Sequence, residues 1–305
     1  MNQPLVYVII LNFNGSRWLL PCLQSLRATE YSNFKTMLVD NASSDGSVEQ
    51  VRSQFPEVEI IANSANLGFS EGNNVGIRKV LAEDADYVVL LNPDTKVTPR
   101  WLRELIAVGE REKEIGILGA VQLTYDGDEF NTWTKTALIE HLAGLQSETA
   151  RDWIPVEWVE GACFAVKHEI FERIGLLDPI YFAFYEEIDF CRRAAHQGYK
   201  TAIVPLSRIH HFRGGSWEAN ATIKRQRDFR CDRSQFIYNL TDPRRSMMAN
   251  LGWYLRTMAT KTKEAALAFS LTKTWDLARI QVDLLFSLPQ LFSKWRRDRA
   301  VVINS

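Results

Sequence analysis

The sequence contains four short, largely apolar runs, and each is followed within two residues by asparagine or aspartate. Runs of this length and apolarity are typical of strands that are covered on both faces of a parallel sheet. Apolar residues at helical spacing follow the first three runs. Strands and helices that alternate with short links predict an α/β fold with a doubly wound, mostly parallel sheet. The four runs are Val6–Leu11, Thr36–Val39, Val58–Ile61 and Tyr87–Leu91.

Polar side chains follow all four predicted strands. In open α/β sheets the carboxyl ends of the strands meet at one edge, where ligands bind. Turns favour Asn and Asp for local reasons, so each single position also has a purely structural interpretation. Because the pattern recurs at four strands, we expect one shared crevice. The residues expected to line it are Asn12, Asn14, Asp40, Asn41, Asn66, Asn92 and Asp94.

Asp94 comes directly after the fourth strand, which we expect to end at Pro93 because proline cannot donate to a strand ladder. A carboxylate there is suited to a hard cation or to a cation-bound diphosphate. The alternative is that Asp94 caps a helix that begins near Thr98. No GxGxxG or GxxxxGK[ST] motif follows the first strand, which disfavours dinucleotide and P-loop sites and also a nucleotidyltransferase.

The order and spacing of four motifs resemble family 2 glycosyltransferases with the GT-A fold, most of all their bacterial rhamnosyltransferase-like branch. The resemblance covers roughly residues 5 to 240. It implies a nucleotide-sugar site in the first half, with Asp40 at the base or ribose and with Gly68 and Asn73 in the same site. It also implies that Asp94 holds Mg²⁺ or Mn²⁺, with Asn92 where many relatives have a second Asp. The motifs are Asn12–Gly15, Val39–Ser47, Asn66–Phe69 with Gly72–Asn74, and Leu91–Asp94.

A second acidic group begins a predicted helix at Glu186, Glu187 and Asp189. Acids in a first turn complement the helix dipole, and this needs no function. Three neighbouring acids also repel one another, which raises the pKa of at least one and suits it to act as a general base. The segment resembles the family pattern in which the second acid takes the acceptor proton. That acid is Glu187 here, where relatives usually have Asp, and Asp189 is the second candidate.

Two further stretches resemble family features. Gly161 and Ala162, in a predicted strand from Val159 to Val166, resemble the small residues that precede the acceptor side. His211 precedes an Arg-Gly-Gly-Ser loop that resembles the family loop over the diphosphate, where the histidine can be a metal ligand beside Asp94. A single histidine is more often a packing or hydrogen-bonding residue. Arg213 is suited to balance diphosphate charge, and the glycines would let the loop move.

Composition limits the setting in which the protein works. A net charge of −1 gives no electrostatic case for nucleic acid. Four dispersed cysteines indicate a reducing compartment, and we expect neither a signal peptide nor a membrane-spanning helix. We therefore expect a cytoplasmic protein, located in part at the inner face of the plasma membrane.

We expect a catalytic domain at 1–218, with a nucleotide-binding half at 1–95 and an acceptor-binding half at 96–218. A helical extension at 219–305 follows. Its mixture of apolar, Trp and basic residues suits an interfacial helix on anionic lipid. The alternatives are a helical subdomain packed on the catalytic domain and a homodimer contact.

These features predict an inverting glycosyltransferase that uses a dTDP- or UDP-sugar, with dTDP-L-rhamnose favoured. The acceptor would be a hydroxyl of a glycan or of a lipid-linked saccharide, as in polysaccharide synthesis. A protein that binds nucleotide-sugars without catalysis, or a scaffold, is the alternative. The single carboxylate in Asn92-Pro93-Asp94 motivates that alternative.

Overall fold

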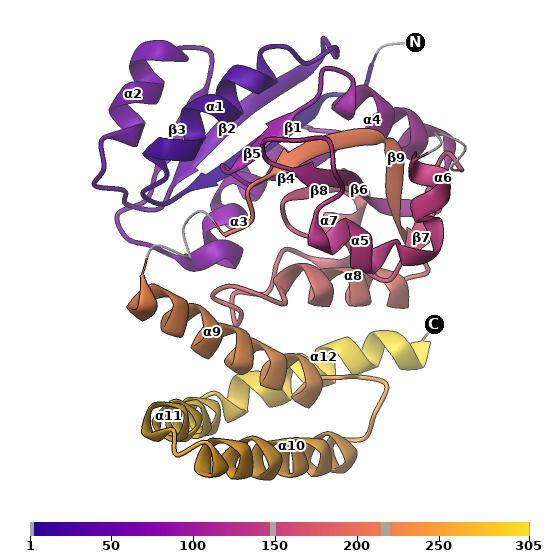
Figure 1. The fold of residues 1–305 in the computed structure, drawn as a ribbon. Helices are drawn as coiled ribbons and strands as arrows, with labels where there is room; N and C mark the ends of the chain where they lie inside the picture. The colour runs from indigo at the N-terminus through magenta and orange to yellow at the C-terminus, as the bar shows by residue number, and fades with distance from the viewer. Residues whose placement is uncertain (1–2, 147–150, 215–219, 305) are drawn as a thin grey trace. The chain divides into compact units, whose positions relative to one another are not determined.

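The computed structural model describes residues 3–146, 151–214 and 220–304 (Figure 1). The chain divides into two compact units. Unit 1 comprises Met1–Phe182 and Glu186–Ala219, and unit 2 comprises Ala183–Tyr185 and Asn220–Ser305. The functional domain limits predicted from the sequence stay a prediction.

Unit 1 is built on a mixed sheet with the strand order β3-β2-β1-β4-β8-β6-β9-β5, and β7 pairs with β9. Its first half, β3 to β4, is parallel, as the helical crossovers require. Strand β8 enters antiparallel between β4 and β6. In chain order the elements are β1 (Val6–Asn12), α1 (Ser16–Leu26), β2 (Phe34–Asp40), α2 (Ser47–Gln54), β3 (Glu59–Ala62), α3 (Gly68–Leu81), β4 (Tyr87–Leu91), β5 (Thr95–Val97), α4 (Trp101–Arg111), β6 (Ile115–Thr124), α5 (Thr132–Ala137), η1 (Ile139–His141), α6 (Leu142–Gln146), β7 (Ile154–Val156), β8 (Cys163–Lys167), α7 (His168–Ile174), α8 (Glu186–His196) and β9 (Lys200–His211).

Successive residues of β1 point to opposite faces of the sheet, and both faces are covered by helices (Figure 1). Ile10 packs in the same cluster as Trp101 of α4, whereas Ile9 packs in the same cluster as Ile77 of α3 and Phe190 of α8. This double coverage explains why the strands read as continuous apolar runs. The predicted α/β class with helices on both faces is confirmed.

Three local features of unit 1 have no clear signal in the sequence. Helix α3 begins at Gly68 and includes the Asn- and Gly-rich stretch through Asn74. Strand β9 passes through Pro205, because the register against β6 shifts there and leaves the proline outside the ladder. The antiparallel strand β5 has no apolar signal of its own, and it pairs Thr95 with His211.

Unit 2 is helical, which confirms the predicted C-terminal helical extension. Its core contains Phe236, Met258, Leu277, Ile280 and Leu284. Ion pairs also join its helices, for example Arg225 to Asp276 at 2.8 Å. Within the described residues, no helix is both long and apolar enough to cross a membrane. The helices are α9 (Ala221–Leu240), α10 (Met247–Leu267), α11 (Leu271–Phe286) and α12 (Leu288–Asn304).

Candidate active site

The ends of β1 and β2 hold Asp40 in a dense hydrogen-bond network. Because the strands are parallel and in register, Asn12 lies opposite Asp40. Asn12 Nδ2 donates to Asp40 Oδ1 at 2.8 Å and lies 3.0 and 2.9 Å from the hydroxyls of Ser43 and Ser47. Ser43 adds its backbone N–H and its hydroxyl, at 2.9 and 2.6 Å. The buried Asp40 carboxylate is therefore fixed in direction by several donors.

The other polar residues predicted at these strand ends mainly hold the loops together. Asn41 Nδ2 donates to the Gly68 carbonyl at 2.9 Å, and Asn66 Oδ1 accepts from the Gly68 N–H at 2.9 Å. Asn14 Oδ1 accepts from the Ser44 N–H at 2.9 Å. Asn73 lies on α3 rather than in a loop, and its Nδ2 donates to a backbone carbonyl of the same helix. The loops around the predicted nucleotide site are thus braced by side-chain amides.

Gly68 is required where the chain enters α3. Its φ is +79°, in the left-handed region that L side chains rarely adopt. A Cβ atom there would lie 2.4 Å from the carbonyl oxygen of Phe182. The Phe69 N–H donates to the same carbonyl, which ties α3 to the segment that ends at Phe182.

Asp94 lies beside His211 because β5 pairs with the end of β9. The Phe212 N–H donates to the Asp94 carbonyl at 3.0 Å, and Asp94 Oδ1 lies 3.4 Å from His211 Nε2. Both side chains are nearly buried. Helix α4 begins at Trp101, and its N-cap residue Arg100 makes no side-chain cap. The structure therefore does not support the alternative in which Asp94 caps this helix.

The predicted acid group at the start of α8 has unusual electrostatics. Burial, followed by the charge of Glu187, raises the pKa of Glu186 well above its ordinary value. Burial is also the main cause that raises the pKa of Glu187 to about 7. The charge of Glu160 adds to this rise, and the N–H groups of Glu187, Gly161 and Ile188 oppose it. Glu186 and Glu187 each retain one enclosed carboxylate oxygen without a hydrogen-bond partner.

Asp189 is in a different situation from its neighbours. Its two oxygens accept from Arg192 at 2.7 Å and from Arg193 at 3.0 Å, and the carboxylate is fully buried. Two guanidinium groups thus engage both oxygens of this carboxylate. The contacts of Asp189 are therefore those of a structural ion pair, which favours Glu187 as the base candidate.

The segment Glu160–Ala162 connects the two predicted centres. The Ala162 carbonyl accepts from the Asn92 N–H at 3.1 Å, next to the loop that carries Asp94. The Gly161 N–H interacts with the carboxylate of Glu187. Glu160 lies 3.9 Å from His211 Nδ1 and 3.2 Å from Arg213. This segment therefore contacts His211, Arg213 and Glu187, and it also holds Asn92 of the loop that carries Asp94.

Two residues of this region were not identified from the sequence. Glu160 directly precedes the Gly161–Ala162 stretch, so an acid at that position was the available signal. Gln122 had no signal, because it lies within an apolar strand, β6, and contacts His211 only in the folded chain. Arg213 is partly exposed, at 43% of its side-chain surface. The rest of the predicted mobile loop, Gly215 and Ser216, lies outside the described residues.

The pair Asp94 and His211 fits one nitrogen and one oxygen ligand of a divalent cation. Imidazole and carboxylate are both suited to Mn²⁺, and a carboxylate is suited to Mg²⁺. Within the residues that the structure describes, no group of three His, Cys, Asp or Glu side chains forms a metal site. Diphosphate oxygens and water are further ligands of the kind that Mg²⁺ and Mn²⁺ prefer.

A mixed sheet that is covered by helices on both faces is the architecture expected of a GT-A glycosyltransferase. The chain belongs to glycosyl transferase family 2, whose sequence profile matches residues 7–175. It is a glycosyltransferase, and the resemblance to the rhamnosyltransferase-like branch is confirmed by the curated relatives.

Two curated relatives illustrate this. N-acetylglucosaminyl-diphospho-decaprenol L-rhamnosyltransferase of Mycobacterium tuberculosis is 24% identical over 241 residues, which cover 68% of this chain and 76% of that protein. The low-salt glycan biosynthesis hexosyltransferase Agl10 of Haloferax volcanii is 31% identical over 172 residues, or 53% of each chain.

Solved structures agree on the fold. Mannosyltransferase PcManGT from Pyrobaculum calidifontis, in complex with GDP-Man and Mn²⁺, has a TM-score of 0.58 at 17% identity and covers 99% of this chain and 86% of its own. GalNAc-T7 with UDP, GalNAc and Mn²⁺ has a TM-score of 0.56 at 18% identity. The match covers 69% of this chain and 44% of that chain. The predicted GT-A fold is confirmed.

Proposed function

We propose that the protein is an inverting glycosyltransferase that moves a sugar from a nucleotide-sugar onto a hydroxyl of a glycan or lipid-linked acceptor. The favoured donor is dTDP-L-rhamnose, and a hexose from a UDP-sugar is the second choice. The main support is the high pKa of Glu187 beside the segment that also contacts Asn92, His211 and Arg213. The named rhamnosyltransferases among the relatives support the choice of donor and acceptor.

In this proposal Glu187 is the general base. Its carboxylate takes the proton of the acceptor hydroxyl as that oxygen forms a bond to the anomeric carbon. The bond between the anomeric carbon and the phosphate oxygen breaks, and its electron pair leaves with the nucleoside diphosphate. Attack from the face opposite the leaving group inverts the anomeric configuration. Glu187 returns its proton to solvent after the product departs.

The leaving group carries the developing charge, so positive groups near Asp94 matter most for the rate. Asp94 and His211 would hold the divalent cation, Mg²⁺ or Mn²⁺, which neutralises charge on the diphosphate when bound. Arg213 is suited to add a further positive charge. Asp40, fixed by Asn12 and Ser43, would accept a hydrogen bond from the base or the ribose.

The experiment is a panel of nucleotide-sugars, with nucleoside diphosphate release measured with and without glycan and lipid-linked acceptors. We expect release to depend on the acceptor and to be fastest with one dTDP- or UDP-sugar. NMR of the product should show an anomeric configuration opposite to that of the donor. Retention of configuration would contradict the single-displacement mechanism. Binding of nucleotide-sugar with no release under any condition would favour the silent binding protein.

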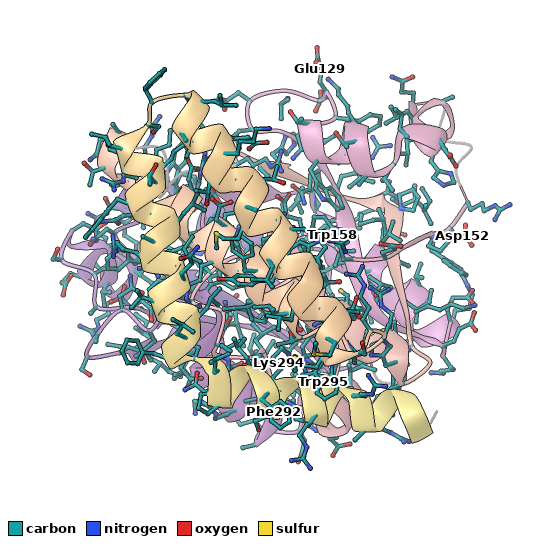
Figure 2. All side chains as sticks on the ribbon, turned by 90° about the horizontal axis from the view of Figure 1, so that it is seen from below. Glu129, Asp152, Trp158, Phe292, Lys294 and Trp295 are labelled. Carbon is teal, nitrogen blue, oxygen red and sulfur yellow. The ribbon has the colours of Figure 1, made fainter. Side chains whose placement is uncertain are left out.

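We also propose that unit 2 contacts an anionic lipid surface, where a lipid-linked acceptor would be presented. Helices α10 and α11 enclose a mostly apolar groove of about 740 Å³. Large apolar side chains of the same two helices are strongly exposed, such as Trp275 at 63% and Phe286 at 85%. On α12, Phe292 stacks on Trp295 with ring centroids 6.0 Å apart (Figure 2). The exposed apolar residues of α10 and α11 are Met248, Leu251, Leu255, Leu267, Leu271, Trp275, Val282, Leu285 and Phe286.

The charge of the same helices favours lipid over a second protein copy. Residues 247–304 carry nine Lys or Arg side chains and four Asp or Glu side chains. Asp276 and Asp283 pair with arginines of α9, and Asp298 pairs with Lys294 of α12. An exposed apolar surface with excess positive charge is typical of helices that lie in the headgroup region of anionic membranes. This would bring the protein to the inner face of the plasma membrane.

Vesicle flotation tests this contact. The full chain should float with vesicles of phosphatidylglycerol and phosphatidylcholine, less so with phosphatidylcholine alone, and less at high salt. A Trp275→Ser/Phe286→Ser variant should lose binding. The control Ile139→Ser/Leu206→Ser, which removes two exposed apolar residues of unit 1, should retain it. If no vesicle binds and the first variant instead converts a dimer to a monomer in light scattering, the surface is a homodimer contact.

A further inference from the structure

We propose that Gln122 and Asn131 are positioning residues that fix which ring nitrogen of His211 carries the proton. They would leave the Nε2 lone pair directed at Asp94, ready for a cation. The role of this lone pair rests on the proposed function, whereas the tautomer itself can be measured without it.

The assignment begins at a donor whose identity is certain. The backbone N–H of Thr134 donates to Asn131 Oδ1 at 2.9 Å, because Asn131 is the N-cap of α5. This fixes the orientation of the Asn131 amide, since its other side-chain atom must be the NH₂ group. That group, Nδ2, lies 3.0 Å from Gln122 Oε1. A donor must meet an acceptor there, so the oxygen of Gln122 and not its nitrogen occupies this place.

The same Gln122 oxygen lies 2.9 Å from His211 Nδ1. Because a carbonyl oxygen only accepts, Nδ1 must carry a hydrogen. A neutral imidazole has one N–H group, so Nε2 carries the lone pair. Nε2 faces Asp94 Oδ1 at 3.4 Å, which places a nitrogen and an oxygen acceptor side by side. Metal-bound histidines commonly donate their second N–H to an oxygen in this way.

Glu160 does not replace Gln122 as the hydrogen-bond partner of Nδ1. Glu160 Oε2 is 3.9 Å from His211 Nδ1, which is beyond hydrogen-bond distance. Gln122, Asn131 and His211 are each at most 6% exposed, so bulk water does not replace the contacts. The Gln122 main chain is also held, because its N–H and C=O both bond the Thr134 hydroxyl, at 3.0 and 2.9 Å. Strand β6 and the start of α5 therefore hold rigidly the chain of hydrogen bonds from Asn131 through Gln122 to His211, which we call the relay.

The decisive variant is Asn131→Asp. Aspartate still caps α5, but its second oxygen replaces the donor that faced Gln122. The Gln122 amide must then turn and present its NH₂ group, so Nδ1 becomes the acceptor and the proton moves to Nε2. Asn131→Ser is the matched control, because serine keeps the cap and introduces no acceptor toward Gln122. Gln122→Leu removes the acceptor altogether and is a second test at the other end of the relay.

Two measurements read the outcome. Imidazole ¹⁵N shifts, with His211 identified by comparison with His211→Asn, should show a protonated Nδ1 in the wild type and in Asn131→Ser. They should show a protonated Nε2 in Asn131→Asp. Electron paramagnetic resonance of Mn²⁺ with UDP or dTDP should give about 10- to 100-fold weaker binding in Asn131→Asp and in Gln122→Leu, the usual cost of losing a second-sphere partner.

A wild-type spectrum with a protonated Nε2, or an Asn131→Asp spectrum like that of the wild type, overturns the proposal. So does unchanged Mn²⁺ affinity in a variant whose tautomer has changed. If the protein shows no transferase activity with any donor, the ¹⁵N result still stands. Failure of the proposed function and failure of the relay are thus separate results.

Discussion

Two carboxylates on either side of the candidate site are held in opposite ways. Asp40, at the predicted nucleotide side, accepts hydrogen bonds on both oxygens from Asn12 and Ser43. Glu187, at the predicted acceptor side, has a raised pKa and one enclosed oxygen without a partner. Both lie at ends of regular elements in the same unit. Proximity to the sheet edge therefore does not decide the chemistry, whereas the placement of the donors on the two oxygens of each carboxylate does.

The difference indicates a division of labour. A carboxylate whose two oxygens both accept hydrogen bonds is held in one direction, which suits recognition of a fixed ligand group. The buried Glu187 carboxylate, with one oxygen that has no donor, holds a proton near neutral pH, which suits it to take up and release one. Changes at Glu187 should accordingly act on turnover, and changes around Asp40 should act on stability and donor binding.

The largest expected effect is on turnover in Glu187→Gln. The amide cannot accept the acceptor proton, so kcat should fall at least ~100-fold while the fold is retained. Measured nucleoside diphosphate release, with circular dichroism for the fold, checks this. Glu172→Gln, an exposed acid on α7, is the control and should be unaffected. Near-normal turnover in Glu187→Gln would remove it from the base role and make Asp189 the candidate.

Asp94→Ala should have an effect of similar size, also at least ~100-fold in turnover. Without this carboxylate the site would hold less well the cation that neutralises the leaving diphosphate. Unlike Glu187→Gln, it should also weaken binding of Mn²⁺ with UDP or dTDP, measured by calorimetry. Asp126→Ala removes an exposed loop acid and should change neither quantity. Loss of turnover with intact Mn²⁺ binding would place Asp94 outside the cation site.

The sequence predicted the nucleotide side of this comparison better than the acceptor side. Strand ends are visible as breaks in apolar runs, so Asn12, Asp40 and Asp94 were identifiable by position. The contact of Asp94 with His211 was expected only from resemblance, because the short strand β5 that creates it has no apolar pattern.

The acceptor side depends on contacts that are distant in the sequence. Glu160 affects Glu187 across 27 positions, and Gln122 reaches His211 across 89. Contacts between residues so far apart in the sequence leave no periodic pattern that a single chain can show. The difference between Glu187 and Asp189 was also invisible, because it depends on which acid the two arginines of α8 reach.

The pH profile should reveal the raised pKa of Glu187. Below its pKa of about 7 the carboxyl is protonated and cannot act as a base. Below that value kcat/KM should therefore fall about tenfold per pH unit, and above it a plateau is expected. Initial rates between pH 5 and 9, at saturating cation, give the profile. A flat profile down to pH 5 would mean that the base has an ordinary carboxylate pKa.

The smallest effects are on stability, and they should have opposite signs on the two sides of the site. Glu187 ionises near its ordinary pKa of 4.5 when unfolded but only near 7 when folded. Its contribution therefore destabilises the fold as pH rises through this window, and the loss is complete above the folded pKa. Glu187→Gln removes the penalty, so its melting temperature should exceed that of the wild type by ~2–4 °C at pH 8 and by little at pH 4.5.

Asn12→Ala should do the reverse. It removes a buried donor that contacts Asp40 and two hydroxyls, and should lower the free energy of unfolding by about 1–3 kcal/mol. Thermal and urea unfolding of both variants at two pH values checks the pair. If Glu187→Gln proved destabilising at pH 8, its carboxylate would have strong partners after all, and the contrast with Asp40 would fail.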